Sequence, residues 1–412
     1  MKRKVVLLVC LMALAGAVLL NGLGAGPGVA VPDVSLDAAT VVDENTRFAL
    51  DLYAELKQKK GNLFFSPYSM SAALAMTYGG ARGNTATEMA EALHFTLGQE
   101  VHAVFAELET RLGEVHKKGT VQLHIANSLW PQRDYPFREE YLALMKKEYA
   151  VSTTPVDYTV ATAREEARRV INEWIAKETK DKIKDLVRQQ DLTDLTTLLL
   201  VNAIYFKGDW ASQFDPDQTS MSDFALLSGE TKQVPMMQQK GTFGYGEFED
   251  VQVLELPYKG KELSMFILLP RDPKGLGDLE KALSAENLET WLSGLREKEL
   301  RVHLPKFKIT WGTFDLKEPL MALGMRDAFI DRQADFSGMD GTRELFIAHV
   351  LHKAFVEVNE EGSEAAAATA VVMAKGIPPA FEADHPFVFL IRENTTGSVL
   401  FLGRVVDPSV DT

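Results

Sequence analysis

The sequence has little cysteine, no excess of basic charge and none of the common catalytic motifs. Its one cysteine, Cys10, lies in an N-terminal segment that we expect to be cleaved, so the mature protein should have neither a disulfide nor thiol chemistry. Lys and Arg number 44 against 58 Asp and Glu, which argues against nucleic acid as a partner because phosphate binding needs clustered basic residues. The motifs GxSxG, HExxH, CxxC and the phosphate loop do not occur. We therefore expect neither an enzyme nor a cofactor.

What is present is enough apolar sequence for a large core. Hydrophobic residues make up 46% of the 412 positions, which excludes a disordered chain. Helical spacing dominates the first half, where Ser66-Pro67 is expected to open a buried helix, and β-rich runs follow from about residue 195. No linker divides the halves, so a single α+β domain is predicted. The expected strands are residues 198–206, 251–256, 263–269, 301–309, 355–359, 387–391 and 399–405.

The N-terminus has the pattern of a secretory signal peptide. Three basic residues at positions 2–4 precede an apolar run at 5–20 and a small-residue stretch that ends at Ala30. An uncleaved membrane anchor is the alternative, but the run is shorter than the roughly 20 residues that span a bilayer. We therefore predict a signal peptide at 1–30, a mature domain at 31–412, and a secreted or extracytoplasmic protein.

The most informative segment is residues 357–377, which is alanine-rich and ends before Pro378-Pro379. Gly362 and the β-branched residues in the second half of the segment argue against a helix. An ordinary surface loop of this length would be unusually long and apolar. Read with a period of two, the face that begins at Ser363 is uncharged, while Glu364 lies on the other. No proline interrupts the segment, so it is built like a spare strand, a loop in one state and part of a sheet in another.

Several motifs occur in a fixed order along the chain: the segments 62–70, 79–85, 201–210, 234–237, 256–258, 304–307, 360–369 and 385–390. Together they resemble the serpin family of serine-protease inhibitors over roughly residues 40–409. The resemblance implies a single-domain fold of mixed β-sheets with about nine surrounding helices and an exposed reactive-centre loop at about 360–380. It also implies a suicide-substrate mechanism, in which a serine protease cleaves the loop and the loop then inserts into a central sheet, sheet A, trapping the acyl-enzyme.

The resemblance assigns roles to particular residues. The mobile hinge of the loop corresponds to Glu360, Gly362, Ser363, Glu364, Ala365, Ala366, Ala367, Ala368 and Thr369. The shutter, a polar cluster under the centre of sheet A, corresponds to Ser66, Ser69, Asn202 and His352, and the breach, where the loop first enters, corresponds to Trp210.

Two distances along the chain that are typical of the family, one from the hinge glycine and one from the prolines, point to different reactive bonds. Counting from Gly362 places the specificity residue at Gly376, whereas counting back from Pro378 places it at Lys375. We favour the bond Lys375–Gly376, because a long cationic side chain fills an acidic specificity pocket, and a trypsin-like target follows. An elastase- or subtilisin-like target remains open through Val372, Met373 and Ala374, and Ile377 is the remaining alternative.

The rival function within the same fold is a non-inhibitory carrier, chaperone or storage protein. Such members tolerate bulky or charged hinge residues, whereas this hinge is small and uncharged on one face, so inhibition is favoured. No heparin site is expected, because the helix predicted from Val101 to Leu112 carries no basic track. His349 and His352 alone do not make a metal site. A monomer is expected.

Overall fold

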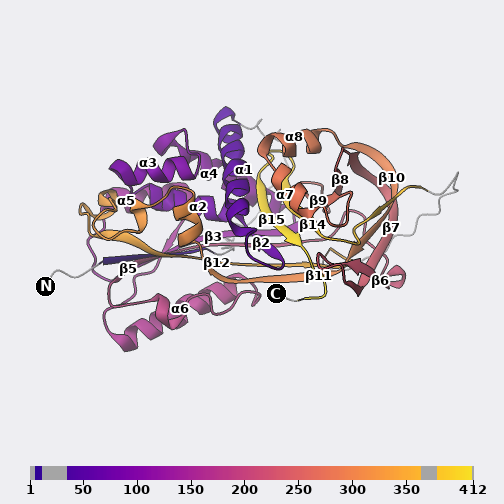
Figure 1. Cartoon of the computed structure of the whole chain (residues 1–412). Helices are drawn as coiled ribbons and strands as arrows, with labels where there is room; N and C mark the ends of the chain where they lie inside the picture. The colour runs from indigo at the N-terminus through magenta and orange to yellow at the C-terminus, as the bar shows by residue number, and fades with distance from the viewer. Residues whose placement is uncertain (1–4, 12–34, 363–377, 411–412) are drawn as a thin grey trace, which may run out of the picture.

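The computed structural model describes residues 5–11, 35–362 and 378–410 and arranges them as helices packed on two β-sheets (Figure 1). The predicted α+β class is confirmed, and these residues contain ten α-helices where about nine were expected. The helices are α1 (Leu36–Leu56), α2 (Pro67–Tyr78), α3 (Gly83–Ala92), α4 (Val101–Lys117), α5 (Glu139–Tyr149), α6 (Ala161–Glu178), α7 (Leu276–Ala282), α8 (Ala285–Ser293), α9 (Lys317–Ala322) and α10 (Ser337–Asp340). Within the described residues, none of them is both long and apolar enough to span a membrane.

The six-stranded sheet corresponds to the expected sheet A. In spatial order its strands are β11 (Phe307–Asp315), β12 (Leu345–Val358), β1 (Val5–Leu11), β5 (Thr196–Gly208), β3 (Val121–Pro131) and β4 (Ser152–Thr153). Strand β1 runs parallel to both of its neighbours, β12 and β5. Residues 5–11 were expected in a leader outside the fold, but an uninterrupted apolar run also suits a parallel strand that is paired on both sides.

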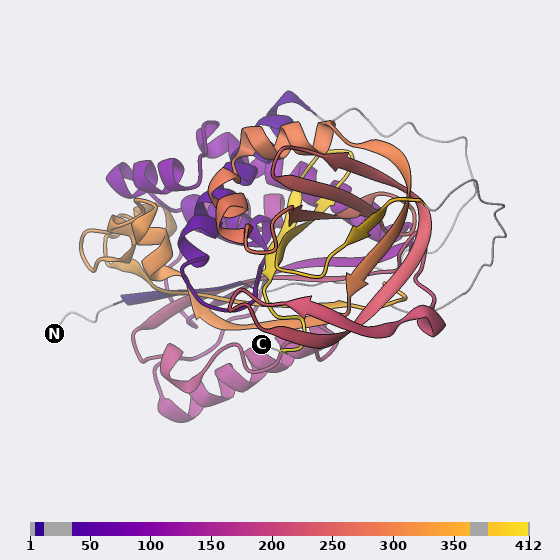
Figure 2. The ribbon, with the colours of Figure 1, turned by 45° about the vertical axis from the view of Figure 1, so that its right-hand side comes forward.

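The nine-stranded sheet, sheet B, curves over one end of sheet A (Figure 2). Its strands in order are β13 (Ala380–Glu382), β10 (Arg296–Pro305), β7 (Thr231–Glu247), β8 (Val251–Pro257), β9 (Leu263–Pro270), β14 (Phe387–Glu393), β15 (Val399–Val405) and β2 (Leu63–Phe65), and β6 (Ser220–Ala225) pairs with β7. The chain passes from sheet B to sheet A at Lys306, which lies between β10 and β11.

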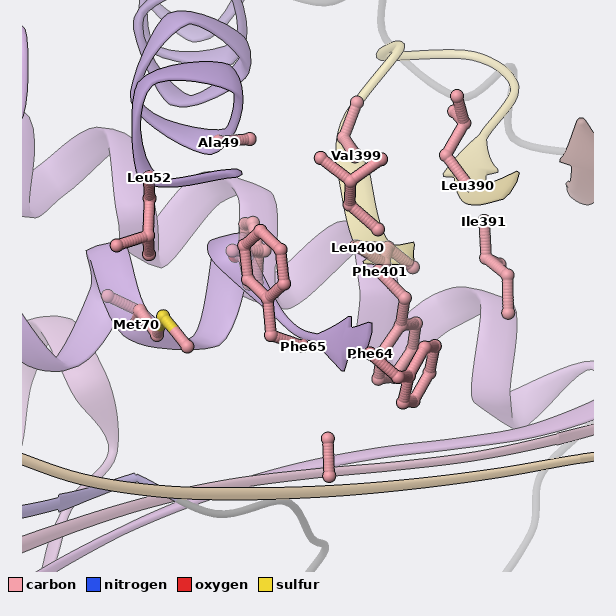
Figure 3. Close-up of a cluster of buried hydrophobic side chains, with 14 of the residues drawn as sticks. Ala49, Leu52, Phe64, Phe65, Met70, Leu390, Ile391, Val399, Leu400 and Phe401 are labelled. Carbon is pink, nitrogen blue, oxygen red and sulfur yellow. The ribbon is translucent and has the colours of Figure 1, made fainter. Parts of the chain in front are cut away.

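Helix α2 fills the space between the two sheets. Ser66 caps it as predicted, its Oγ accepting the N–H of Ser69, and Pro67 occupies the first turn, where a missing N–H costs nothing. Every residue of α2 is buried, and the helix contacts both β5 and β15. Beside it Phe64 stacks on Phe401 with ring centroids 5.2 Å apart, within the apolar cluster above the strands of sheet A (Figure 3). A buried apolar core therefore packs against one face of sheet A.

Helix α6 lies on the opposite face of sheet A from α1 to α5 (Figure 1). Trp174 of α6 packs edge-on against Trp130 of β3, with ring centroids 5.9 Å apart. Both faces of sheet A are therefore covered in this region.

Candidate functional site

The chain that leaves the C-terminal end of β12 is held by backbone hydrogen bonds. The N–H of Trp210 donates to the carbonyl of Glu361 at 3.1 Å, and the N–H of Phe214 donates to the carbonyl of Glu360 at 2.9 Å. The indole Nε1 of Trp210 donates to the carbonyl of Asn359 at 3.0 Å. The start of the expected hinge is thus fixed to the segment that follows β5.

Glu360 is further held through its carboxylate, which is buried. Thr219 Oγ1 donates to Glu360 Oε1 at 2.7 Å, and Lys306 Nζ lies 2.7 Å from Oε2. Burial opposes ionisation of this carboxyl, but the hydrogen bonds from Lys306 and Thr219 outweigh it and hold the pKa of Glu360 below its usual value. The charged carboxylate ties the end of β12 to the Lys306 crossover between the two sheets.

Gly362, the last described residue before the alanine-rich segment, is in a conformation that glycine alone adopts easily. Its φ is +81°, and a Cβ there would lie 2.4 Å from the Trp210 backbone nitrogen and 2.5 Å from the carbonyl oxygen of Gly208. The two obstacles are backbone atoms, which cannot rotate away. Close approach to the end of β5 therefore requires glycine at this position.

We expect Gly362→Ala to disturb the hinge more than a positive φ alone would. Gly61→Ala is the matched control, because Gly61 has a φ of +91° with open space around its α-carbon. The control should cost about 1 kcal/mol of unfolding free energy, whereas Gly362→Ala should cost at least about 2 kcal/mol, through broken bonds to Trp210. Denaturant unfolding of both variants measures the difference, and equal losses would show that the contact with β5 is unimportant.

A groove opens between the ends of β5 and β12, next to this glycine. Its lining includes Phe206, Lys207, Phe355 and Val358, and it has a volume of about 280 Å³. Trp210 lies in the same lining and stacks on Tyr258 with ring centroids 4.6 Å apart. Among the described residues, no strand pairs with the facing edges of 203–208 and 353–358, since β1 ends at the level of Leu11. The groove is thus bordered by two strands with no third strand between them in the described part of the chain.

The residues assigned to the shutter lie together beneath β5 and β12. Ser66 donates from its Oγ to the carbonyl of Leu400 at 2.7 Å, and its backbone N–H donates to His352 Nε2 at 3.3 Å. Ser66, Ser69 and His352 are all buried. Asn202 and His352 occupy the same row of the sheet, because the register partner of each in β1 is Leu11.

His352 is a neutral imidazole in this setting. Burial lowers its pKa to about 3. Because Nε2 accepts the N–H of Ser66, the ring proton is assigned to Nδ1, which has no hydrogen-bond partner among the described side chains.

The far end of the alanine-rich segment is tied to sheet B. The carbonyl of Pro379 accepts the N–H of Arg301 at 3.0 Å, and the carbonyl of Pro378 accepts from Arg301 Nε at 3.3 Å. The two ends of the segment are therefore held on different sheets. The remaining predicted site residues lie outside the described residues: Ser363, Glu364, Ala365, Ala366, Ala367, Ala368, Thr369, Val372, Met373, Ala374, Lys375, Gly376 and Ile377.

Sequence reasoning missed the partners that hold the ends of the segment. These are Lys306 and Thr219 on Glu360, Phe214 on its carbonyl, Tyr258 under Trp210, and Arg301 beyond the prolines. Each is far in the chain from the residue it holds, so no local spacing marks it. The buried Glu360 was the one available signal, because a carboxylate inside a fold requires a cation.

Comparison with known proteins matches residues 43–408 to the family described as serpin (serine protease inhibitor). The chain is 44% identical to the human (Homo sapiens) leukocyte elastase inhibitor over 378 residues, which cover 88% of this chain and 98% of the relative. It is 43% identical to human Serpin B3, with 89% and 99% covered. A tumour-suppressing serpin superposes with a TM-score of 0.81 at 31% identity, covering 90% of this chain and all of the other.

Uncleaved ovalbumin superposes with a TM-score of 0.80 at 30% identity, with 90% of this chain and 100% of that chain covered. The expectation that the protein is no enzyme is confirmed, because the matched family and the relatives named above include protease inhibitors. The expected fold is confirmed as well.

The prediction of a secreted protein is wrong. The family match begins only at residue 43, and the two human relatives are matched over 98% and 99% of their own length, so they have no counterpart of the apolar N-terminal segment. The physical reason for the error is that the core of a signal peptide and a fully paired parallel strand have the same composition. In this structure Val5–Leu11 is hydrogen-bonded into sheet A.

Proposed function

Since the chain belongs to the serpin family of serine protease inhibitors, we propose that it is a suicide-substrate inhibitor whose loop inserts into sheet A. The observation that carries this proposal is the groove between β5 and β12. Among the described residues no strand pairs with its two edges, and the chain leaves β12 at Gly362, beside that groove. An extended segment that turns back from Gly362 can pair with both edges at once.

The chemistry is divided between the protease and this chain. The protease serine Oγ attacks the carbonyl carbon of Lys375, the peptide C–N bond breaks, and the Gly376 nitrogen leaves with a proton as a free amine. The acyl-enzyme is then either hydrolysed by water or carried away as the loop inserts. About ten new hydrogen bonds at a net of about 1 kcal/mol each make insertion favourable by on the order of 10 kcal/mol. Loss of one oxyanion-hole donor already costs about 3 kcal/mol, so a modest distortion of the protease stops hydrolysis.

In this proposal the hinge residues and the shutter residues act at successive stages of loop insertion. The small residues from Ser363 to Thr369 enter the groove first, passing Trp210. His352 and Asn202 lie in the row that the loop reaches later, and the free Nδ1–H of His352 then meets the acceptors of the new strand. The hinge roles rest on composition, and the cluster roles rest on the contacts of Ser66 with His352.

Two classes of target compete for the reactive bond. Lys375 favours a trypsin-like protease, because its long cationic side chain fills an acidic specificity pocket. The similarity to leukocyte elastase inhibitor favours an elastase-like protease, which would cleave after a small or unbranched residue such as Ala374 or Met373. Both targets fit the same insertion mechanism.

Incubation with trypsin and with an elastase, followed by a denaturing gel and mass spectrometry of the released C-terminal peptide, separates the two. We expect a denaturant-resistant complex with trypsin and a peptide that begins at Gly376. A complex formed only with elastase, with a peptide that begins at Lys375 or Ala374, would replace the trypsin-like assignment. Lys375→Ala is the matched variant, and it should lose the trypsin complex while retaining any elastase complex.

A carrier, chaperone or storage role is excluded by the same gel. A carrier has no need of loop insertion. Trypsin and the elastase would therefore each cleave its loop completely without forming a covalent complex. Complex formation with any one of them establishes inhibition.

A further inference from the structure

Strand β1 occupies the central position of sheet A, between the two strands that must accept the loop. Val9 pairs with Val350 of β12 on one side and with Leu200 of β5 on the other. In Figures 1 and 2 the indigo arrow of β1 continues the plane of the sheet. Where β1 is present, both inner edges are therefore already paired.

The strand fills only one half of the gap. Leu11, its last residue, stands at the level of His352 and Asn202, and the groove lies beyond it towards Gly362. A loop that turns back from Gly362 runs antiparallel to β12, so its leading residues meet open edges along 353–358. Its next residues meet β1. Further insertion needs the same backbone groups that β1 holds.

We propose that Val5–Leu11 is an internal occupant of sheet A that must leave before the reactive loop can insert fully. The inference rests on the proposed inhibitory function. The occupant carries no charge, proline or glycine, as a strand paired on both sides requires. It delays the insertion step, so water hydrolyses a larger share of the acyl-enzyme before the protease is trapped.

The exchange runs in one direction once it starts. β1 is a strand of seven residues that is parallel to both neighbours, whereas the loop would be longer and antiparallel. Antiparallel pairing is slightly more stable per residue, and a longer strand forms more hydrogen bonds. The loop therefore displaces β1, and the brake sets the rate of insertion, and with it the share of protease that is trapped, without preventing insertion.

The single cysteine allows β1 to be locked reversibly in the full-length protein. Cys10 is the register partner of Leu351, and neighbouring strands lie about 4.8 Å apart, within the roughly 4.4–6.8 Å that a disulfide spans between α-carbons. In Leu351→Cys, oxidised glutathione removes two electrons and two protons from the thiols and joins β12 to β1. The control is Cys10→Ser in the same background, which cannot form the bond.

With the disulfide closed, we expect covalent complex with the protease to fall by at least about tenfold while loop cleavage continues, and a thiol reductant should restore the complex. Failure of the reduced protein to trap any protease would refute the proposed inhibitory function instead, so the two failures are distinguishable. Absence of a cross-link between Cys10 and the thiol introduced by Leu351→Cys, or equal trapping by the oxidised and reduced forms, would overturn the placement of β1 as a brake.

Val9→Pro provides a second readout without a cross-link. Proline removes a ladder N–H from β1, so the strand should leave more easily and trapping should become faster, by about tenfold. Val18→Pro is the control, because it places the same residue in the same apolar run beyond the end of β1. Equal rates for Val9→Pro and Val18→Pro would contradict the proposal.

Discussion

Ser363→Arg turns the inhibitor into a substrate. Ser363 is the first residue of the uncharged face, so on insertion its side chain must enter the sheet interior, where a guanidinium has no acidic partner. An unpaired buried charge costs several kcal/mol, and this cost falls on the first step of insertion, before later hydrogen bonds can offset it. Acylation at Lys375 should proceed at nearly its usual rate. We expect complete loop cleavage, at least about tenfold less covalent complex, and recovered protease activity.

Glu364→Arg is the matched control for that experiment. It adds a guanidinium one position along, on the face that points to solvent once the segment is a strand. It should therefore retain most of the complex that Ser363→Arg loses. If the two variants behave alike, the alternation of faces assigned to the hinge is wrong, and full retention by Ser363→Arg would refute insertion beginning at this end.

The runs with the strongest β pattern were predictable because their burial leaves a continuous apolar signal. Residues 263–269, 387–391 and 399–405 correspond to β9, β14 and β15, which are buried along nearly their whole length. The run 301–309 was predicted as one strand, but it is two strands that belong to different sheets and meet at Lys306. Apolar residues lie on both sides of Lys306, so only tertiary pairing reveals the change of sheet.

Strand β7 was missed for the opposite reason. Its 17 residues include Gly241, Gly244 and Gly246, which read as turn signals. In the fold these glycines avoid clashes, since a Cβ at Gly246 would lie 2.8 Å from the ring of Phe248. Close packing by neighbouring aromatic rings explains glycine inside a strand, and no local pattern distinguishes it from a turn.

The candidate site shows the same difference between local signals, which the sequence displays, and long-range contacts, which it does not. The capping role of Ser66 was predictable because capping is a local property, and the hinge, predicted from composition, stays a prediction. The ion pair of Lys306 with Glu360 and the stacking of Tyr258 on Trp210 join residues more than 40 positions apart. Strand β1 shows this most strongly, because its sequence suits both a leader and a central strand. Only its pairing with β5 and β12 distinguishes the two.

Cleavage of the loop should raise the thermal stability of the protein. Among the described residues no strand lies between 203–208 of β5 and 353–358 of β12, and a freed loop would pair with both. A gain on the order of 10 kcal/mol, at about 2 °C per kcal/mol in a protein of this size, predicts a rise of the unfolding midpoint by on the order of 20 °C. An ordinary nick in a surface loop would lower the midpoint instead, because it adds more conformational freedom to the unfolded chain than to the folded one and adds no contacts.

The measurement compares intact and nicked protein by calorimetry after cleavage with a metalloprotease, which attacks through water and forms no acyl-enzyme. Nicked Ser363→Arg is the control, because its loop is cut in the same place but cannot begin insertion. The wild-type midpoint should rise and that of the nicked variant should stay near its intact value. Equal midpoints for intact and nicked wild-type protein would show that the alanine-rich segment is not a spare strand. In that case the gap between β5 and β12 beside Gly362 would have to accept some other extended segment.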